Sequence, residues 1–295
     1  MDNRSLESLE NLVLLGNVNE EINKLPDSIF QAIVTSPPYF GHRDYSGEEN
    51  KNEIGKEENV EDYVKTLVDV FRKVKPKLKD NGLLWLNLGD TYRNNNLLGV
   101  PWRVALGLQN DGWMLRSDII WHKPNAMPSP VKNRPTVSHE YVFLLSKGND
   151  YYYDADAIRE PHITFSEQSK MKGGRNHFGK AGGTPEAGKN SGSQNLHKGR
   201  WDQAFHPKGR NKRTVWEIPL SKFKDAHFAV YPEKLVEICI LASTKERDYV
   251  FDPFTGSGTT GVVALKLGRK FVGIELVEKF RDMAQKRIDL NIRLL

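Results

Sequence analysis

Phe251-Asp-Pro-Phe-Thr-Gly-Ser-Gly-Thr-Thr260 is the stretch that decides the fold, because it joins an expected strand, 249–251, to an expected helix, 259–267. Gly256 and Gly258 permit backbone conformations and a close ligand approach that side chains would block. The free N–H groups of the following helix attract an anionic group such as a carboxylate. The stretch lacks the lysine of a phosphate loop and the full GxGxxG spacing of a dinucleotide fingerprint, which disfavours a nicotinamide dehydrogenase.

An acid follows at the end of the next expected strand, 270–274, in the sequence Phe271-Val-Gly-Ile-Glu275. A carboxylate in this position suits acceptance of hydrogen bonds from both ribose hydroxyls of a nucleoside. The turn and the acid together favour a cofactor that contains adenosine. The alternative is a tight turn beside a surface glutamate.

Expected strands and helices alternate along the rest of the chain. Apolar runs typical of buried strands cover 12–15, 32–35, 83–89, 117–123 and 139–147. Helical spacing covers 60–82, where Asn81-Gly82 ends it, and also 101–112, 232–243 and the C-terminal residues. The alternation predicts an α/β fold with a doubly wound, mostly parallel sheet.

Length and composition exclude several classes of protein. With 295 residues the chain can hold one large α/β domain with a modest insertion. Its sequence has no apolar run of about 20 residues and no apolar signal-peptide core, so we expect no membrane association and a cytoplasmic setting, prokaryotic or viral. The single cysteine, Cys239, cannot form an internal disulfide or a cysteine-rich zinc site, and we expect no metal.

Positive charge is concentrated in one region. Residues 165–213 carry eleven Lys and Arg against three Asp and Glu, whereas the remainder carries 32 basic and 35 acidic residues. This distribution indicates that one region meets a polyanion, and the alternative is a disordered basic linker. We therefore divide the chain into 1–147, an insert at 148–213, and 214–295.

The second informative motif is Thr35-Ser-Pro-Pro-Tyr39, at the end of the expected strand 32–35. Two prolines fix φ and donate no hydrogen bond, so the strand must end there with rigidly held carbonyls. One interpretation is a strand-ending turn with an incidental tyrosine. The functional hypothesis is a pocket for a planar ring that carries an amino group: Tyr39 stacks on the ring, while Ser36 and the Pro37 carbonyl accept from the NH₂.

These motifs carry a specific resemblance. TSPPY resembles motif IV of the DNA amino-methyltransferases, DPFTGSGTT resembles their motif I, FVGIE their motif II, and HFAVYPEKL, 227–235, their motif X. The order of the motifs is that of the β class, and the resemblance covers 12–288. It implies a circularly permuted class I methyltransferase fold, S-adenosyl-L-methionine as methyl donor, and a target-recognition region in the basic insert.

The resemblance also implies which residues form the site. The expected catalytic residues are Ser36, Pro37, Pro38 and Tyr39. The expected cofactor-binding residues are Asn17, His227, Phe228, Pro232, Asp252, Pro253, Phe254, Gly256, Gly258, Thr259, Thr260 and Glu275. Because the chain ends one helix after Glu275, the next strand of the sheet must be 12–15, and Asn17 after it stands where family members often have aspartate.

Double-stranded DNA is the expected partner. Candidate contacts are Lys123, Lys132 and Arg134 in the loop 121–135, and Arg175, Arg200, Arg210 and Arg213 in the insert, with Asn176 and Gln203 as further base readers. For the loop, solvated surface charge is an equal alternative. The chain is expected to act as a monomer or homodimer, alone or beside a restriction endonuclease that works separately.

The expected reaction is methylation of the exocyclic N4 of a cytosine extruded from the duplex. Serine at the head of TSPPY resembles the N4-cytosine enzymes, although serine and aspartate can both accept an amino hydrogen, so adenine N6 is the alternative. Carbon-5 methylation needs a cysteine nucleophile, and Cys239 lies in an apolar helical stretch typical of core. More distant alternatives are an RNA or protein amide methyltransferase and an inactive DNA-binding relative.

Overall fold

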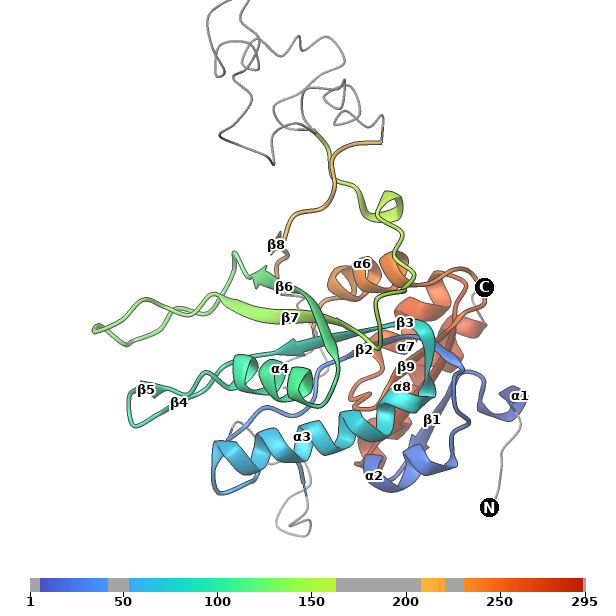
Figure 1. Cartoon of the computed structure of the whole chain (residues 1–295), viewed down its shortest axis with the longest axis horizontal. Helices are drawn as coiled ribbons and strands as arrows, with labels where there is room; N and C mark the ends of the chain where they lie inside the picture. The colour runs from blue at the N-terminus through green and yellow to red at the C-terminus, as the bar shows by residue number, and fades with distance from the viewer. Residues whose placement is uncertain (1–5, 42–52, 163–207, 221–230, 294–295) are drawn as a thin grey trace, which may run out of the picture. The chain divides into compact units, whose positions relative to one another are not determined.

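The computed structural model describes residues 6–41, 53–162, 208–220 and 231–293 (Figure 1). The chain divides into two compact units, one formed by 1–154 with 213–295 and the other by 155–212. The predicted insert, 148–213, contains the second unit. Within the described part of that unit, Asp156–Ile158 forms a 3₁₀ turn, and Glu160 and Arg210 pair as an isolated β-bridge.

The first unit contains an eight-stranded sheet in the order β1-β10-β9-β2-β3-β7-β6-β8 (Figure 1). The strands are β1 (Leu12–Leu15), β10 (Lys270–Glu275), β9 (Tyr249–Asp252), β2 (Phe30–Thr35), β3 (Leu78–Leu88), β7 (His139–Ser146), β6 (Met114–His122) and β8 (Val215–Glu217). The first five are parallel, β7 is antiparallel to both neighbours, and β8 pairs parallel with β6. The mostly parallel sheet is confirmed, as is the position of the N-terminal strand beside β10.

Helices pack against the sheet in two groups. The first group holds α2 (Val18–Glu21), α3 (Val60–Val74) and α4 (Val100–Asn110); the second holds α6 (Glu233–Ser243), α7 (Thr259–Lys266) and α8 (Glu278–Ile292). Successive residues of β3 contact different groups of helices. Leu84 packs in the core cluster that contains α3 and α4. Trp85 donates a 3.1 Å hydrogen bond from Nε1 to Ser243 Oγ in α6. Burial of β2 and β3 on both faces explains why their sequences are apolar without alternation.

The helix α3 begins where the sequence predicts but ends earlier than predicted. Asn59 caps its N-terminus by accepting from the backbone N–H of Asp62, and Tyr63, Leu67 and Phe71 recur at helical spacing in the core. The predicted extension to residue 82 is wrong, because α3 ends at Val74 and a 3₁₀ turn, Lys75–Lys77, follows. Pro76 has no N–H to donate, and the chain then enters β3 at residue 78.

Short elements complete the described chain: α1 (Leu6–Leu9), a 3₁₀ turn at Ile22–Lys24, and a hairpin of β4 (Tyr92–Arg93) and β5 (Asn96–Leu97). Asn94 and Asn95 form the hairpin turn in left-handed conformations, with φ of 52° and 60°. Among the helices that the structure describes, none has the length and hydropathy needed to cross a membrane.

Candidate active site

A cavity of about 410 Å³ lies at the carboxyl ends of the parallel strands, the edge where open α/β sheets bind ligands. The residues after β1, β10, β9 and β2 all contribute to its lining, so segments from both ends of the chain meet there. Ser36 and Gly256, one from each of the two motifs, line this same cavity.

The glycine-rich turn follows β9, and its two functional glycines do different things. Both have positive φ, 54° at Gly256 and 82° at Gly258. A Cβ at Gly258 would lie 2.9 Å from the Cα of Ala284, so this glycine lets α8 pack against the turn. A Cβ at Gly256 would meet nothing closer than 4.0 Å, and this glycine lines the cavity. The space beside Gly256 is therefore open to a ligand in the cavity.

Asp252 ends β9 and is fully buried behind the turn. Its carboxylate accepts from Thr35 Oγ1 at 2.6 Å, from Thr260 Oγ1 at 2.6 Å and from the Phe254 backbone N–H at 3.0 Å. Burial raises the pKa of Asp252, and these hydrogen bonds oppose the rise. Through this carboxylate the strand β2, the turn and the helix α7 are held together, and the side chain does not line the cavity.

Glu275, at the end of β10, lines the cavity beside the glycine turn. Its Oε2 accepts from the backbone N–H of Gly256 at 2.8 Å, and its Oε1 accepts from that of Val277 at 2.9 Å. Burial raises the pKa of this carboxyl group to about 7, because loss of solvent outweighs the two hydrogen bonds. Asn17 lies nearby and caps α2, with its side chain accepting from the backbone N–H of Asn19.

The second motif lines the same cavity. After β2 ends at Thr35, all four residues Ser36–Tyr39 line the cavity. Tyr63 of α3 donates a 2.8 Å hydrogen bond to the Pro38 carbonyl and fixes the turn. Gly89 lies against the ring of Tyr39, since a Cβ there would come within 2.7 Å of Tyr39 Cε2.

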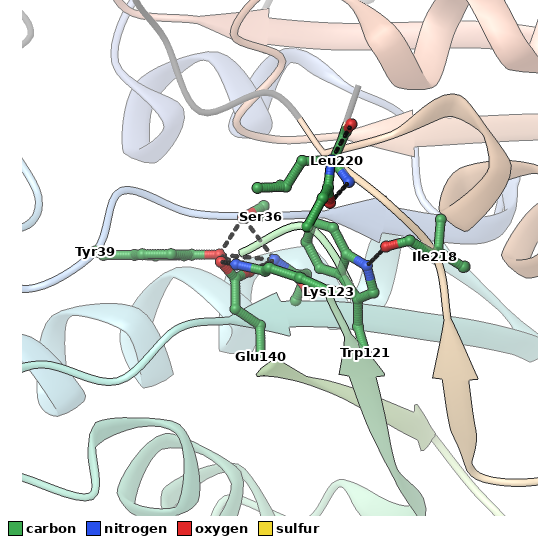
Figure 2. Close-up of polar contacts among 9 residues, drawn as sticks. Ser36, Tyr39, Trp121, Lys123, Glu140, Ile218 and Leu220 are labelled. Atoms are coloured by element: carbon green, nitrogen blue, oxygen red, sulfur yellow. Dashed lines mark hydrogen bonds and ion pairs between the residues drawn. The ribbon is translucent and has the colours of Figure 1, made fainter. Parts of the chain in front are cut away.

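A polar network joins this motif to β3 and β7 (Figure 2). The Tyr39 hydroxyl donates to Glu140 Oε2 at 2.7 Å. Asn87 Nδ2 donates to the Tyr39 hydroxyl oxygen and to Glu140 Oε2, each at 2.7 Å. Ser36 Oγ lies 3.2 Å from the Tyr39 hydroxyl, and Lys123 forms an ion pair with Glu140 Oε1. Burial and the Glu140 carboxylate raise the pKa of Tyr39 well above its ordinary value, so the phenol stays protonated.

A third segment closes this side of the cavity. Trp121 donates from Nε1 to the Ile218 carbonyl at 2.8 Å, and the backbone N–H of Leu220 donates to Asn125 Oδ1 at 2.8 Å (Figure 2). These bonds hold the segment after β8 so that Leu220 lines the cavity.

The structure brings together most of the residues predicted from the sequence. Besides the four of TSPPY, the predicted residues that line the cavity are Asn17, Lys123, Pro253, Phe254, Gly256, Thr259 and Glu275. Four predicted cofactor-binding residues do not line it: Pro232, Asp252, Gly258 and Thr260. His227 and Phe228 lie outside the described residues.

Several lining residues were not predicted, among them Asn87, Glu140, Tyr231 and Leu220. A polar residue inside the apolar run that forms β3 is a signal that could have found Asn87. Glu140 could not be found in this way. It lies at the cavity edge of the sheet because β7 runs antiparallel to β3.

The predicted DNA contacts differ in their surroundings. Lys132 and Arg213 are exposed, and the Arg134 guanidinium lies 3.9 Å from the Tyr92 ring centre. Arg210, in the second unit, donates from Nε to Glu160 Oε1 at 2.8 Å. Arg175, Asn176, Arg200 and Gln203 lie outside the described residues.

No metal centre accompanies the cavity within the described ranges, where no three His, Cys, Asp or Glu side chains gather closely enough to hold an ion. Cys239 is buried in α6, and burial raises the pKa of its thiol. A buried, protonated thiol in the core is not placed to act as a nucleophile.

Comparisons with known proteins agree with this geometry. Residues 30–286 match the model of the N6/N4 DNA methylase family. The chain is 40% identical to the type II methyltransferase M.SmaI of Serratia marcescens, over 94% of this chain and 90% of that protein. It is 39% identical to the type II methyltransferase M.Cfr9I of Citrobacter freundii, over 94% of this chain and 88% of that protein.

Solved structures share the fold. The cytosine-N4-specific PvuII DNA methyltransferase has a TM-score of 0.67 at 20% identity, covering 97% of this chain and 94% of that one. A DNA modification methylase of Thermus thermophilus, solved with S-adenosyl-L-methionine, has a TM-score of 0.59 at 23% identity, covering 95% of this chain and 94% of that one. The chain therefore belongs to the N6/N4 family of DNA methyltransferases and has the class I S-adenosylmethionine-dependent methyltransferase fold.

Proposed function

We propose that this protein transfers a methyl group from S-adenosyl-L-methionine to the exocyclic N4 of a cytosine extruded from double-stranded DNA at a specific sequence. The observation that carries the proposal is that Ser36 and Gly256 line one cavity. A donor held at the glycine turn and an amino group held at TSPPY then share one cavity, as methyl transfer requires.

The cofactor end of the cavity fits an adenosine-containing methyl donor. Glu275 offers carboxylate oxygens to the ribose hydroxyls, and Gly256 offers open backbone. Val277 and Phe280 add apolar lining suited to a purine, and Asn17 lies at the same end after β1. When bound, S-adenosylmethionine supplies a methyl group activated by its sulfonium.

At the other end, Ser36 and the Pro37 carbonyl accept hydrogen bonds from the target amino group. Such acceptors favour a pyramidal nitrogen, whose lone pair is then free to attack rather than delocalised into the ring. Catalysis comes from positioning and preorganised electrostatics, with no covalent enzyme intermediate. Tyr39 lines the cavity as a stacking partner for the base, and its hydroxyl is held by Asn87 and Glu140.

The choice of cytosine N4 rests on serine at the head of TSPPY. Adenine N6 is the competing target, because a serine hydroxyl can accept from either amino group. The curated relatives are named type II methyltransferases, which supports a separate restriction endonuclease as the companion activity. The basic insert, with Arg213 in the described part of the chain, would meet the DNA backbone, as would Lys132 and Arg134 of the loop 121–135.

Methyl transfer from labelled S-adenosylmethionine into duplex DNA tests the proposal. The DNA is digested to nucleosides and analysed by mass spectrometry, and DNA from cells that express the chain is sequenced for modified bases to find the site. N4-methylcytosine at one sequence is the expected product. N6-methyladenine would overturn the choice of base, and incorporation into RNA alone would overturn the substrate class.

A further inference from the structure

One side of the cavity contains an ion pair that the proposed chemistry does not yet use. The ammonium of Lys123 pairs with Glu140, and the two side chains are only 16% and 15% exposed (Figure 2). Removing two charges from water is costly, and the mutual attraction of the pair often does no more than repay that cost. An ion pair inside a ligand cavity is therefore a candidate for ligand recognition.

The backbone holds both partners firmly. Lys123 directly follows β6 and donates its backbone N–H to the Ser138 carbonyl at 2.7 Å, while Glu140 pairs with Trp121 in the β6–β7 register. The Lys123 ammonium also lies 4.7 Å from the Trp121 ring centre. An ammonium has three N–H donors, and the Glu140 carboxylate accepts one of them. The cation is thus fixed in place with donors left for a molecule in the cavity.

Glu140 links this cation to the TSPPY turn. While its Oε1 accepts from Lys123, its Oε2 accepts from the Tyr39 hydroxyl, and that hydroxyl lies 3.2 Å from Ser36 Oγ. The two ends of the carboxylate therefore fix the distance between a fixed donor, Lys123, and a fixed acceptor, Ser36.

Building on the function proposed above, we propose that Lys123 reads the Watson–Crick edge of the extruded base, with Glu140 as its positioning residue. Cytosine presents an amino donor followed by two acceptors, N3 and O2. The acceptors Ser36 and Pro37 match the amino group, and the donors of Lys123 match N3 and O2. On adenine, the amino group is followed by one ring acceptor, N1, and then by the C2–H. Adenine therefore offers the donors of Lys123 one acceptor in place of two.

A substrate analogue combined with a variant tests this pairing. The target cytosine in a duplex is replaced by 3-deazacytosine, which keeps the amino group and O2 but has C–H in place of N3. Single-turnover methylation of both duplexes is measured for the wild type and for Lys123→Met, Lys123→Arg and Glu140→Gln. We expect the analogue to slow the wild type about tenfold or more, as for loss of a charged hydrogen bond. We expect Lys123→Met to methylate the cytosine duplex slowly and to methylate the 3-deazacytosine duplex at nearly the same rate.

Two controls separate recognition from folding. Lys147, which pairs with Asp80 away from the cavity and is 19% exposed, provides a matched ion-pair variant, and Lys147→Met should keep the full analogue penalty. Lys123→Arg retains hydrogen-bond donors and should methylate the cytosine duplex faster than Lys123→Met. This variant also tests the inference if Lys123→Met does not fold. Binding of S-adenosylhomocysteine and thermal melting check the cofactor end of each variant.

The inference would be overturned if folded Lys123→Met methylated cytosine at the wild-type rate and were slowed by 3-deazacytosine as much as the wild type is. The ion pair would then only connect β6 to β7. That result would not touch the proposed function. Wild-type protein that makes no N4-methylcytosine at all would instead overturn the proposed function, and this inference with it.

Discussion

The backbone N–H of Gly256 donates a 2.8 Å hydrogen bond to Glu275 Oε2, which joins the glycine turn to the acid at the end of the neighbouring strand. The two motifs that predict a nucleoside cofactor therefore form one structural unit, across the β9–β10 pairing. The carboxylate that would accept from a ribose already holds the turn that would contact the rest of the cofactor.

The first prediction concerns pH. Burial raises the pKa of Glu275 from 4.5 to about 7, so below about pH 7 the ligand-free fold favours the protonated acid. Its contribution to stability is complete below about pH 4.5 and is lost as pH rises through about 7. Acceptance from both ribose hydroxyls requires the carboxylate. The affinity for S-adenosylhomocysteine, measured by calorimetry, should therefore rise between about pH 6 and about pH 8.

Glu275→Gln supplies the control for this pH dependence. The amide cannot ionise. At high pH the variant should bind S-adenosylhomocysteine more weakly than the wild type by about 1.5–3 kcal/mol, and its affinity should not rise through neutral pH by way of this group. A wild-type pH profile in the glutamine variant would show that Glu275 does not carry the effect.

The second prediction concerns the TSPPY turn. Ser36→Ala removes an acceptor for the target amino group and should lower the rate of methyl transfer without weakening S-adenosylhomocysteine binding. Tyr39→Ala should in addition weaken binding of the extruded base by about 1–3 kcal/mol, the range for base–aromatic stacking. Single-turnover rates and DNA titrations measure the two effects, and wild-type turnover in both variants would contradict the pocket assignment.

The third prediction concerns Gly89. A methyl group at this position would come within 2.7 Å of the Tyr39 ring, so Gly89→Ala must displace the ring or β3 and should lower activity at least as much as Tyr39→Phe. Gly148→Ala is the matched control, because a Cβ there meets nothing within 4 Å. Equal activity of the two alanine variants would show that the position of the Tyr39 ring does not matter.

The fourth prediction concerns Asp252. Its replacement by Ala leaves the hydroxyls of Thr35 and Thr260 and the N–H of Phe254 without their buried acceptor. Each orphaned group costs about 1–3 kcal/mol, so the midpoint of denaturation should fall strongly, and cofactor affinity should fall with it. Asp80→Ala, at a position 98% exposed, should change neither quantity by more than a small amount.

The fifth prediction concerns salt. If Lys132 and Arg134 contact phosphates, the logarithm of DNA affinity should fall steeply with the logarithm of salt concentration, and the double alanine variant should reduce that slope by about 2. Lys286→Ala, an exposed lysine on α8, should leave the slope unchanged. A flat salt dependence of the wild type would count against the basic insert and this loop together.

By itself the sequence determined the class of fold and predicted the two motifs whose residues line the cavity. Apolar runs buried on both faces, glycines between a strand and a helix, and prolines that end a strand are local features, and local sterics and hydrogen bonding are sufficient to read them. The sequence also predicted the placement of the N-terminal strand beside the strand that ends at Glu275, and the parallel pairing of β1 with β10 confirms it.

Only the tertiary structure decided which side chains share the cavity. Asp252 and Thr260 belong to the glycine-rich motif, yet their side chains do not line the cavity and instead hydrogen-bond to each other behind it. Glu140, near the start of β7, reaches Tyr39 because β7 runs antiparallel to β3. Lys123 follows the end of β6 and pairs with Glu140 at the same edge of the sheet. Register, strand direction and burial are set by contacts between residues distant in sequence, and local patterns do not encode them.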